Sequence, residues 1–184
     1  MSEFTVHNLE NAPEGSKPVL ENLKKSVGAI PNLAGMMAGS PQLIEAFVRV
    51  REIWQKTSFT PLEREVVAAT NAVTNECRYC VAIHSTFALK EGIGPSDLDL
   101  IRAGKSPVEP RLKALSDFAR KIMLNRGQTS DADLEEFLSA GFTRTQALEL
   151  LVGTANSVLA NFSNHLTDAP LDEFLKPQAW SATA

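Results

Sequence analysis

The stretch "FTPLEREVVAATNAVTNECRYCVAIHSTFALKEG", residues 59–92, predicts two consecutive helices joined by a tight turn. Thr60 can cap the first helix, and Pro61 suits its first position because a proline there loses no backbone hydrogen bond. Glu63 stands three residues after the cap, which is the spacing of a capping box. The residues "VTNE", 73–76, then favour the end of the first helix and the start of the second. With so short a connection, the two helices are expected to pack antiparallel.

Both cysteines of the chain and one of its three histidines lie in the second helix. With Thr74 or Asn75 as its cap, this helix would place Cys77 in the first turn, where free N–H groups and the helix dipole favour a thiolate. At about 100° per residue, Cys77, Cys80 and His84 fall within a sector of about 60°. Cys80 and His84 are direct neighbours at i and i+4. The imidazole can therefore take the Cys80 proton, as an activated thiol nucleophile requires.

The first helix offers a carboxylate for this histidine. If the turn lies near Asn75, Glu65 lies ten residues before it and His84 nine after it. These positions have the same height in an antiparallel helix pair, so Glu65 can orient the imidazole and stabilise its protonated form. Glu63 is the alternative partner on the same turn, although it is also expected to cap the helix. Arg64 is expected to point elsewhere.

Helical periodicity continues along the rest of the chain, and no stretch alternates apolar and polar residues as a strand would. The second helix of the pair is expected to end at Gly92. The other expected helices are marked by capping residues and glycine stops, and they cover residues 17–27, 41–56, 94–104, 110–126, 130–141 and 143–164. The sequence predicts an all-α, single-domain bundle over residues 17–167. An irregular segment, 1–16, precedes it, and a tail, 168–184, is expected to lie over the surface.

A weak internal sequence similarity leaves open the interpretation that the bundle arose by duplication. The segments "REVVAAT", 64–70, and "LELLVGT", 148–154, align at an offset of 84 residues. The same offset aligns the two cysteines with Asn161 and Asn164. Buried helices rich in Ala, Val and Leu resemble one another easily, so this similarity is weak evidence for a duplication. In a duplicated chain, only the first copy would carry thiols.

The composition limits the function further. The 184 residues carry a net charge of −4, with 43% hydrophobic and 22% charged residues, as in a globular domain. No basic cluster for nucleic acid stands out, and no apolar run approaches the roughly 18 residues of a membrane span. Because the N-terminal region lacks the apolar core of a signal peptide, we expect a cytoplasmic protein. That reducing compartment favours a catalytic or metal-binding cysteine pair over a structural disulfide.

The spacing Glu65-x11-Cys77-x2-Cys80-x3-His84, within "LEREVVAATNAVTNECRYCVAIH", resembles the signature of the AhpD-like alkylhydroperoxidase and carboxymuconolactone decarboxylase superfamily. The motif covers a short part of the chain, and the all-helical layout agrees over most of the rest. The resemblance implies an AhpD-like helical fold that needs no cofactor. It also implies assembly into homotrimers or homohexamers.

The same resemblance implies a thiol peroxidase mechanism. Cys80 would be the attacking thiolate, with His84 and Glu65 as its proton relay, and Cys77 would close a disulfide with it. The substrate would be a small hydroperoxide, and an external dithiol such as a lipoyl-bearing protein would reduce the disulfide. The best-studied peroxidatic members carry a histidine directly before the second cysteine, whereas this chain has Tyr79. The chain thus resembles an uncharacterised, peroxidase-related branch, in which Tyr79 is expected to line or cover the dithiol.

Two other interpretations of the cysteines stay open. Cys77, Cys80, His84 and Glu65 could form a closed zinc site. However, ligands at i, i+3 and i+7 on one helix span about 10 Å along its axis, which makes one ion hard to share. Alternatively, the chain is a non-catalytic helical oligomer with a redox-sensing or vestigial dithiol. Such a protein would form the disulfide but would show no turnover with any reductant.

Overall fold

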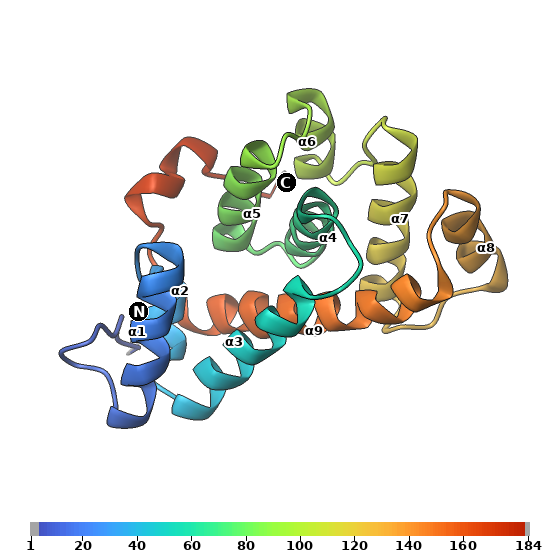
Figure 1. Cartoon of the computed structure of the whole chain (residues 1–184). Coiled ribbons are helices and arrows are strands. Elements are labelled where there is room, and N and C mark those ends of the chain that lie inside the picture. The colour runs from blue at the N-terminus through green and yellow to red at the C-terminus, as the bar shows by residue number, and fades with distance from the viewer. Residues whose placement is uncertain (1–3, 183–184) are drawn as a thin grey trace.

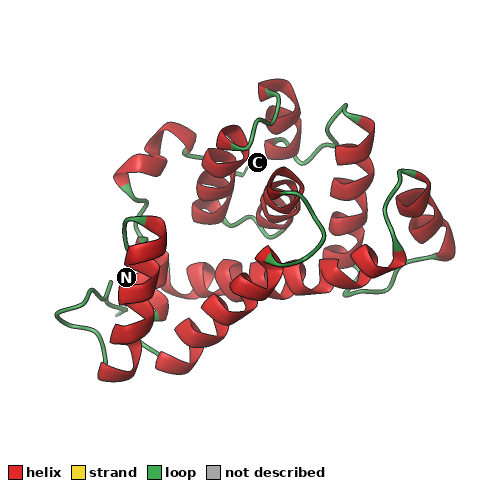
Figure 2. Ribbon diagram, viewed as in Figure 1, coloured by secondary structure: helices red, strands yellow, loops and turns green. Residues whose placement is uncertain are grey.

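The computed structural model describes residues 4–182, and all regular structure in that range is helical (Figures 1 and 2). Residues 1–3 and 183–184 of the expected terminal segments lie outside the described residues. The elements in chain order are η1 Glu14–Ser16, α1 Lys17–Val27, α2 Asn32–Met37, α3 Pro41–Gln55, α4 Pro61–Thr74, α5 Arg78–Lys90, α6 Pro95–Arg102, α7 Pro110–Leu124, α8 Asp131–Ser139, α9 Arg144–Thr167 and η2 Glu173–Gln178. The all-α fold expected from the sequence is confirmed.

The local capping signals place most helix starts correctly. Thr60 and Glu63 form the expected capping box of α4, and Ser130 and Thr143 begin α8 and α9 in the same way. Each box satisfies two backbone N–H groups that the helix itself cannot pair. Helix α1 ends at Gly28, whose left-handed φ of 87° lets its N–H bond to a carbonyl of the last turn. These starts follow from chemistry within a few residues.

Helix α2 was not expected, because the segment between Gly28 and Pro41 resembles a loop. Its residues 33–37 are all buried, so it has no apolar stripe that periodicity could reveal. Tertiary contacts hold it instead, since the backbone N–H of His7 donates to the carbonyl of Gly35 at 3.1 Å. A Cβ at Gly35 would lie 2.7 Å from the carbonyl oxygen of His7, so the N-terminal segment can approach only a glycine there.

Helix α4 lies at the centre of the molecule, where Figure 1 shows it end-on, with α5 and α7 on either side and the long α9 below. Its Val66 and Val67 belong to one apolar cluster with side chains of α6 to α9, while its Ala72 belongs to a second cluster. The second cluster joins α1 to α3 with the start of α5 and the C-terminal segment, and it contains Cys77 and Cys80. Because α4 is buried on several sides, its position fixes the start of α5.

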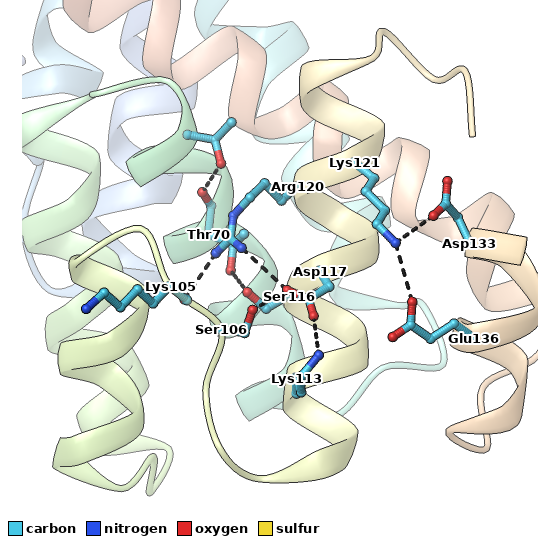
Figure 3. A network of polar contacts seen from close by, with 11 residues as sticks. Thr70, Lys105, Ser106, Lys113, Ser116, Asp117, Arg120, Lys121, Asp133 and Glu136 are labelled. Carbon is cyan, nitrogen blue, oxygen red and sulfur yellow. Dashed lines mark hydrogen bonds and ion pairs between the residues drawn. The ribbon is translucent and has the colours of Figure 1, made fainter. Parts of the chain in front are cut away.

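Polar contacts attach α7 to its neighbours (Figure 3). The hydroxyls of Thr70 in α4 and Ser116 in α7 share a buried hydrogen bond of 2.9 Å. Asp117 accepts the Ser106 hydroxyl at 2.5 Å and the Lys113 ammonium at 2.7 Å. Burial alone would raise the pKa of the Asp117 carboxyl, but the hydrogen bonds from Lys113 and Ser106 bring the net pKa below its ordinary value. The α4–α7 contact is thus both apolar and polar.

The C-terminal segment returns over α5 after α9 ends at Asp168, which has a left-handed φ of 49°. Figure 1 shows the segment, in red, passing from the end of α9 towards α5 and α6. Leu175 in η2 is fully buried. The Arg102 guanidinium donates to the carbonyls of Gln178 and Ala179, and the Trp180 indole N–H donates to the Arg102 carbonyl at 2.9 Å. Among residues 4–182, no helix is long and apolar enough to cross a membrane.

Candidate active site

The turn between α4 and α5 lies later in the chain than expected. Thr74 and Asn75 complete α4, because the Thr74 hydroxyl donates to the Thr70 carbonyl at 2.8 Å and the Asn75 N–H donates to the Asn71 carbonyl at 3.0 Å. Glu76 then takes a left-handed φ of 54° and turns the chain. The prediction that Thr74 or Asn75 caps the second helix was therefore wrong, because α4 uses both residues itself.

Cys77 is the N-cap of α5, and it does not lie in the first turn as expected. Its Sγ accepts the backbone N–H of Cys80 at 3.3 Å, taking the place of the oxygen that usually caps a helix. The two residues form a disulfide, with their Cα atoms 5.3 Å apart. The exposed fractions of Cys77 and Cys80 are 0% and 1%, so neither sulfur meets solvent in this conformation.

His84 and Glu65 form a hydrogen-bonded pair across the α4–α5 contact. The His84 Nδ1 lies 2.8 Å from the Glu65 Oε2, and both side chains are partly buried. A carboxylate only accepts hydrogen bonds, so the Nδ1–H of His84 is the donor in this pair. Glu63, the alternative partner, is occupied elsewhere: it accepts the Thr60 N–H at 2.8 Å and the Arg111 Nε at 2.7 Å.

The four residues that the sequence singles out are thus joined as two pairs. His84 and Glu65 line a cavity of about 310 Å³ together with Arg51, Trp54, Arg64 and Phe87. The two cysteines lie at the start of α5 and belong to the second apolar cluster. Within the described residues, the one hydrogen bond of the His84 ring is the one to Glu65. His84 follows Cys80 by about one helical turn, so α5 carries one member of each pair.

Tyr79, between the cysteines, is tied to the C-terminal segment. Its hydroxyl donates to the Asp172 carboxylate at 2.5 Å, and the same carboxylate accepts the Asn32 N–H at 3.1 Å. Burial and the hydrogen bond to Asp172 raise the pKa of Tyr79 far above its usual range, so the phenol remains a donor. Sequence reasoning missed Asp172, because no local signal connects it with a residue 93 positions away.

A second cavity, of about 430 Å³, lies beside this contact. Its lining includes Arg78, Tyr79, Asn164, Asp168, Leu171 and Trp180. The exposed ends of Arg78 and Asp168 form an ion pair of 3.3 Å at its edge. The C-terminal segment therefore both walls this cavity and covers the start of α5.

The zinc interpretation requires three or more ligands around one point. Across residues 4–182, no group of three or more His, Cys, Asp or Glu side chains is arranged to hold a metal ion. The two sulfurs are bonded to each other, and the His84 ring is bonded to Glu65. With the sulfurs bonded to each other, neither is available as a thiolate ligand for a metal ion.

Comparisons with known proteins give a family match over part of the chain and a shared fold over nearly all of it. Residues 41–121 match the model of the carboxymuconolactone decarboxylase family. No curated protein matches the chain. Among solved structures, the alkylhydroperoxidase AhpD core of an uncharacterized peroxidase-related protein from Ralstonia eutropha JMP134 has a TM-score of 0.82 at 23% identity, with 95% of this chain and 94% of that one covered.

Two further structures share the fold. An uncharacterized peroxidase-related protein from Silicibacter sp. TM1040 has a TM-score of 0.76 at 21% identity, with 96% of each chain covered. The debrominase Bmp8, in complex with 2,3,4-tribromopyrrole, has a TM-score of 0.77 at 16% identity, with 97% of this chain and 96% of that one covered. At these identities the likeness concerns the fold. The match to the carboxymuconolactone decarboxylase family model is confined to residues 41–121, whereas the fold is shared with these structures over nearly the whole chain.

Proposed function

We propose that this protein is a thiol-dependent peroxidase that reduces small hydroperoxides through a dithiol–disulfide cycle of Cys77 and Cys80. The observation that carries the proposal is the position of this pair, whose Cα atoms lie 5.3 Å apart at the start of α5. A histidine one helical turn further on, paired with Glu65, supplies a base. We place the protein in the cytoplasm, where dithiols are kept reduced.

The proposed cycle uses no group beyond the protein and its two substrates. The Cys80 thiolate attacks the terminal oxygen of the hydroperoxide, the O–O bond breaks, and the alcohol leaves with a proton while Cys80 becomes a sulfenic acid. The Cys77 thiol then attacks the Cys80 sulfur, which forms the disulfide and releases water. An external dithiol, for which a lipoyl-bearing protein is the expected class, returns two electrons and two protons by thiol–disulfide exchange.

Two different groups assist the two sulfurs. The free Nε2 of His84 accepts the Cys80 proton and returns it to the leaving alkoxide, while Glu65 stabilises the imidazolium between these steps. Cys77, as the N-cap, is stabilised as a thiolate by the Cys80 N–H and by the positive end of α5. This division suits Cys80 to attack and Cys77 to resolve.

A turnover assay tests the proposal. Purified protein is mixed with dihydrolipoamide and, separately, cumene hydroperoxide, tert-butyl hydroperoxide or hydrogen peroxide, and peroxide loss is followed. We expect many equivalents consumed per protein. Consumption that stops after one equivalent would favour the redox-sensing alternative. A protein that consumes no peroxide at all would contradict the peroxidase proposal. Because one fold neighbour is a debrominase, 2,3,4-tribromopyrrole is included, and bromide release in place of peroxide loss would point to reductive dehalogenation.

The proposed cycle requires the cover over the disulfide to open, because both sulfurs are buried. Asp172 holds this cover by accepting from Tyr79 and from the backbone of α2. Asp172→Asn replaces one acceptor oxygen by a donor and removes the charge, which weakens the cover by about 1–2 kcal/mol. If opening limits access, reduction of the disulfide by dithiothreitol should accelerate roughly 5- to 30-fold, as measured by alkylation and mass spectrometry.

Glu173→Gln is the matched control, because Glu173 is the next residue of the same segment and its exposed carboxylate bonds to Lys176. This variant should be reduced at the wild-type rate. An Asp172→Asn protein that is reduced no faster than the control would contradict the role of the C-terminal segment as the cover.

A homo-oligomer is the second part of the proposal, supported by an apolar face on α9. Leu148, Leu151, Phe162 and Leu166 are 68%, 48%, 55% and 69% exposed. At about 100° per residue they fall within a sector of about 60°, so they form one stripe along the helix. A contiguous apolar stripe of this kind is typical of a protein–protein contact. The occupant that we propose is the same stripe of further copies, in a homotrimer or homohexamer.

The double variant Phe162→Glu/Leu166→Glu should dissociate this assembly, because it brings like charges together in an apolar contact. Light scattering after size-exclusion chromatography gives the mass directly. Val108→Glu is the control, since Val108 is 74% exposed but lies outside the stripe. A wild-type protein that elutes as a monomer, or a double variant with unchanged mass, would contradict the contact.

A further inference from the structure

A buried polar seam runs between α4 and α9, beside the dithiol. We define it as Asn71 and Asn75 of α4 with Ser157, Asn161 and Asn164 of α9. The Asn71 Nδ2 donates to the Ser157 hydroxyl at 3.2 Å, and the Asn75 Nδ2 donates to the Asn161 Oδ1 at 2.8 Å. Both pairs are 86 residues apart, so α4 and α9 lie alongside each other in the same direction.

The seam contains polar atoms that the protein itself does not satisfy. The exposed fractions of Asn71, Asn161 and Asn164 are 0%, 1% and 6%. Among the described residues, the Asn71 Oδ1, the Asn161 Nδ2 and the Asn164 Oδ1 are buried without a hydrogen-bond partner. Native proteins rarely bury such atoms unpaired, and ordered water is the usual partner.

The α9 residues with these atoms share one face of the helix. At about 100° per residue, Ser157, Asn161 and Asn164 fall within a sector of about 60°. Along the helix, the row therefore presents a hydroxyl, an unpaired donor and an unpaired acceptor in succession. A water molecule can both donate and accept, so it matches this mixture, whereas an ion of either charge would match only part of it.

The two ends of the seam lie at the two cavities of the site. Ser157 lines the cavity of His84 and Glu65, and Asn164 lines the cavity beside Tyr79. Between them, Ala72 of α4 and Ala160 of α9 belong to the apolar cluster that contains both cysteines. The seam thus has a cavity at each end, and between the cavities it borders the apolar cluster that contains the disulfide.

We propose that the polar seam binds a file of internal water molecules that serves the Cys77–Cys80 pair. Its role in the cycle rests on the proposed function. Condensation of the Cys80 sulfenic acid with the Cys77 thiol forms the S–S bond and one water molecule in a buried place, and this water leaves along the file. In the reverse direction, the external dithiol becomes a disulfide, and the two protons that the buried sulfurs gain arrive through the same waters.

A crystal structure of the oxidised wild-type protein, at a resolution that shows ordered solvent, tests the binding site alone. Water should lie within about 2.7–3.2 Å of the Asn71 Oδ1, the Asn161 Nδ2 and the Asn164 Oδ1. A seam without water, in which the carboxamides bond to one another, would overturn the proposal. This result does not depend on whether the protein has peroxidase activity, so the two proposals can fail separately.

The role of the file is tested by chemical reduction of the disulfide with dithiothreitol, which also needs no peroxidase activity. Asn161→Leu removes polar atoms from the middle of the file, and reduction should slow at least about tenfold and lose part of its solvent deuterium isotope effect. Ser116→Ala is the control, because it removes a buried hydroxyl on the other side of α4. Asn71→Leu replaces the first variant if that one does not fold. A folded seam variant with the control's rate and isotope effect would overturn the role.

Discussion

Cys80→Ser is expected to abolish the consumption of hydroperoxide. The serine hydroxyl has no accessible anion at neutral pH and is a far weaker nucleophile than a thiolate. Loss of the attacking group should lower the rate by about 10³-fold or more, down to the background of the assay. The change is nearly isosteric, and residue 80 has an exposed fraction of 1%, so circular dichroism and the thermal midpoint serve to show that the fold persists.

Cys77→Ser is the matched comparison for this variant. The Cys80 thiol and its neighbour His84 remain, so one equivalent of peroxide should still be consumed, and the sulfenic acid should then persist long enough to be trapped by a dimedone probe. The reverse pattern, with activity in Cys80→Ser and none in Cys77→Ser, would contradict the assignment. It would make the N-cap cysteine the nucleophile, activated by the Cys80 N–H in place of the histidine.

Glu65→Gln is expected to slow peroxide consumption roughly 10- to 100-fold, within the range of general acid–base effects. The amide keeps the shape of the side chain but cannot stabilise a protonated imidazole at 2.8 Å as the carboxylate does. The comparison covers pH 6 to 9. The measurement is the pH–rate profile of both proteins.

Glu149→Gln is the control for this variant. Glu149 occupies the position that the offset of 84 residues aligns with Glu65, but its carboxylate accepts from Ser58, away from His84. This control should keep the wild-type profile. A Glu65→Gln protein with unchanged rates across the whole range would argue against the relay and leave His84 without an assisting carboxylate.

The parts of the fold that the sequence predicts are those in which chemistry acts over a few residues. Thr60, Pro61 and Glu63 mark the start of α4 because a capping box needs no tertiary partner. The proximity of Glu65 and His84 follows from helix geometry once the turn between the helices is placed within a residue or two. An error in the cap position did not affect this pair.

The parts that could not be predicted depend on contacts across the chain. Helix α2 is buried on all sides, and the carboxylate that caps it comes from Asp172, 140 residues from Asn32. Cys77, and not Thr74 or Asn75, is the N-cap of α5, because those two residues form the last turn of α4. Neither helix α2 nor the N-cap of α5 can be recognised from a short stretch of sequence around it.

The two segments with similar sequences can be compared in the structure. Helix α9 continues without a break through Asn161 and Asn164, the positions that align with the cysteines, whereas the chain turns between α4 and α5. A second copy, if the chain is duplicated, has kept the helix but lost the turn that makes a cysteine an N-cap. Asparagines at these two positions contribute to the polar seam instead.

The measurement that tests the central claim most directly is a thiol count by mass spectrometry on the reduced protein. Free thiols are counted by alkylation before and after one equivalent of cumene hydroperoxide, and again after dihydrolipoamide. We predict rapid loss of both thiols as one intramolecular disulfide between Cys77 and Cys80, followed by full recovery of both thiols with the dithiol. Two thiols that peroxide leaves untouched, or an intact mass that reveals a bound metal, would contradict the account.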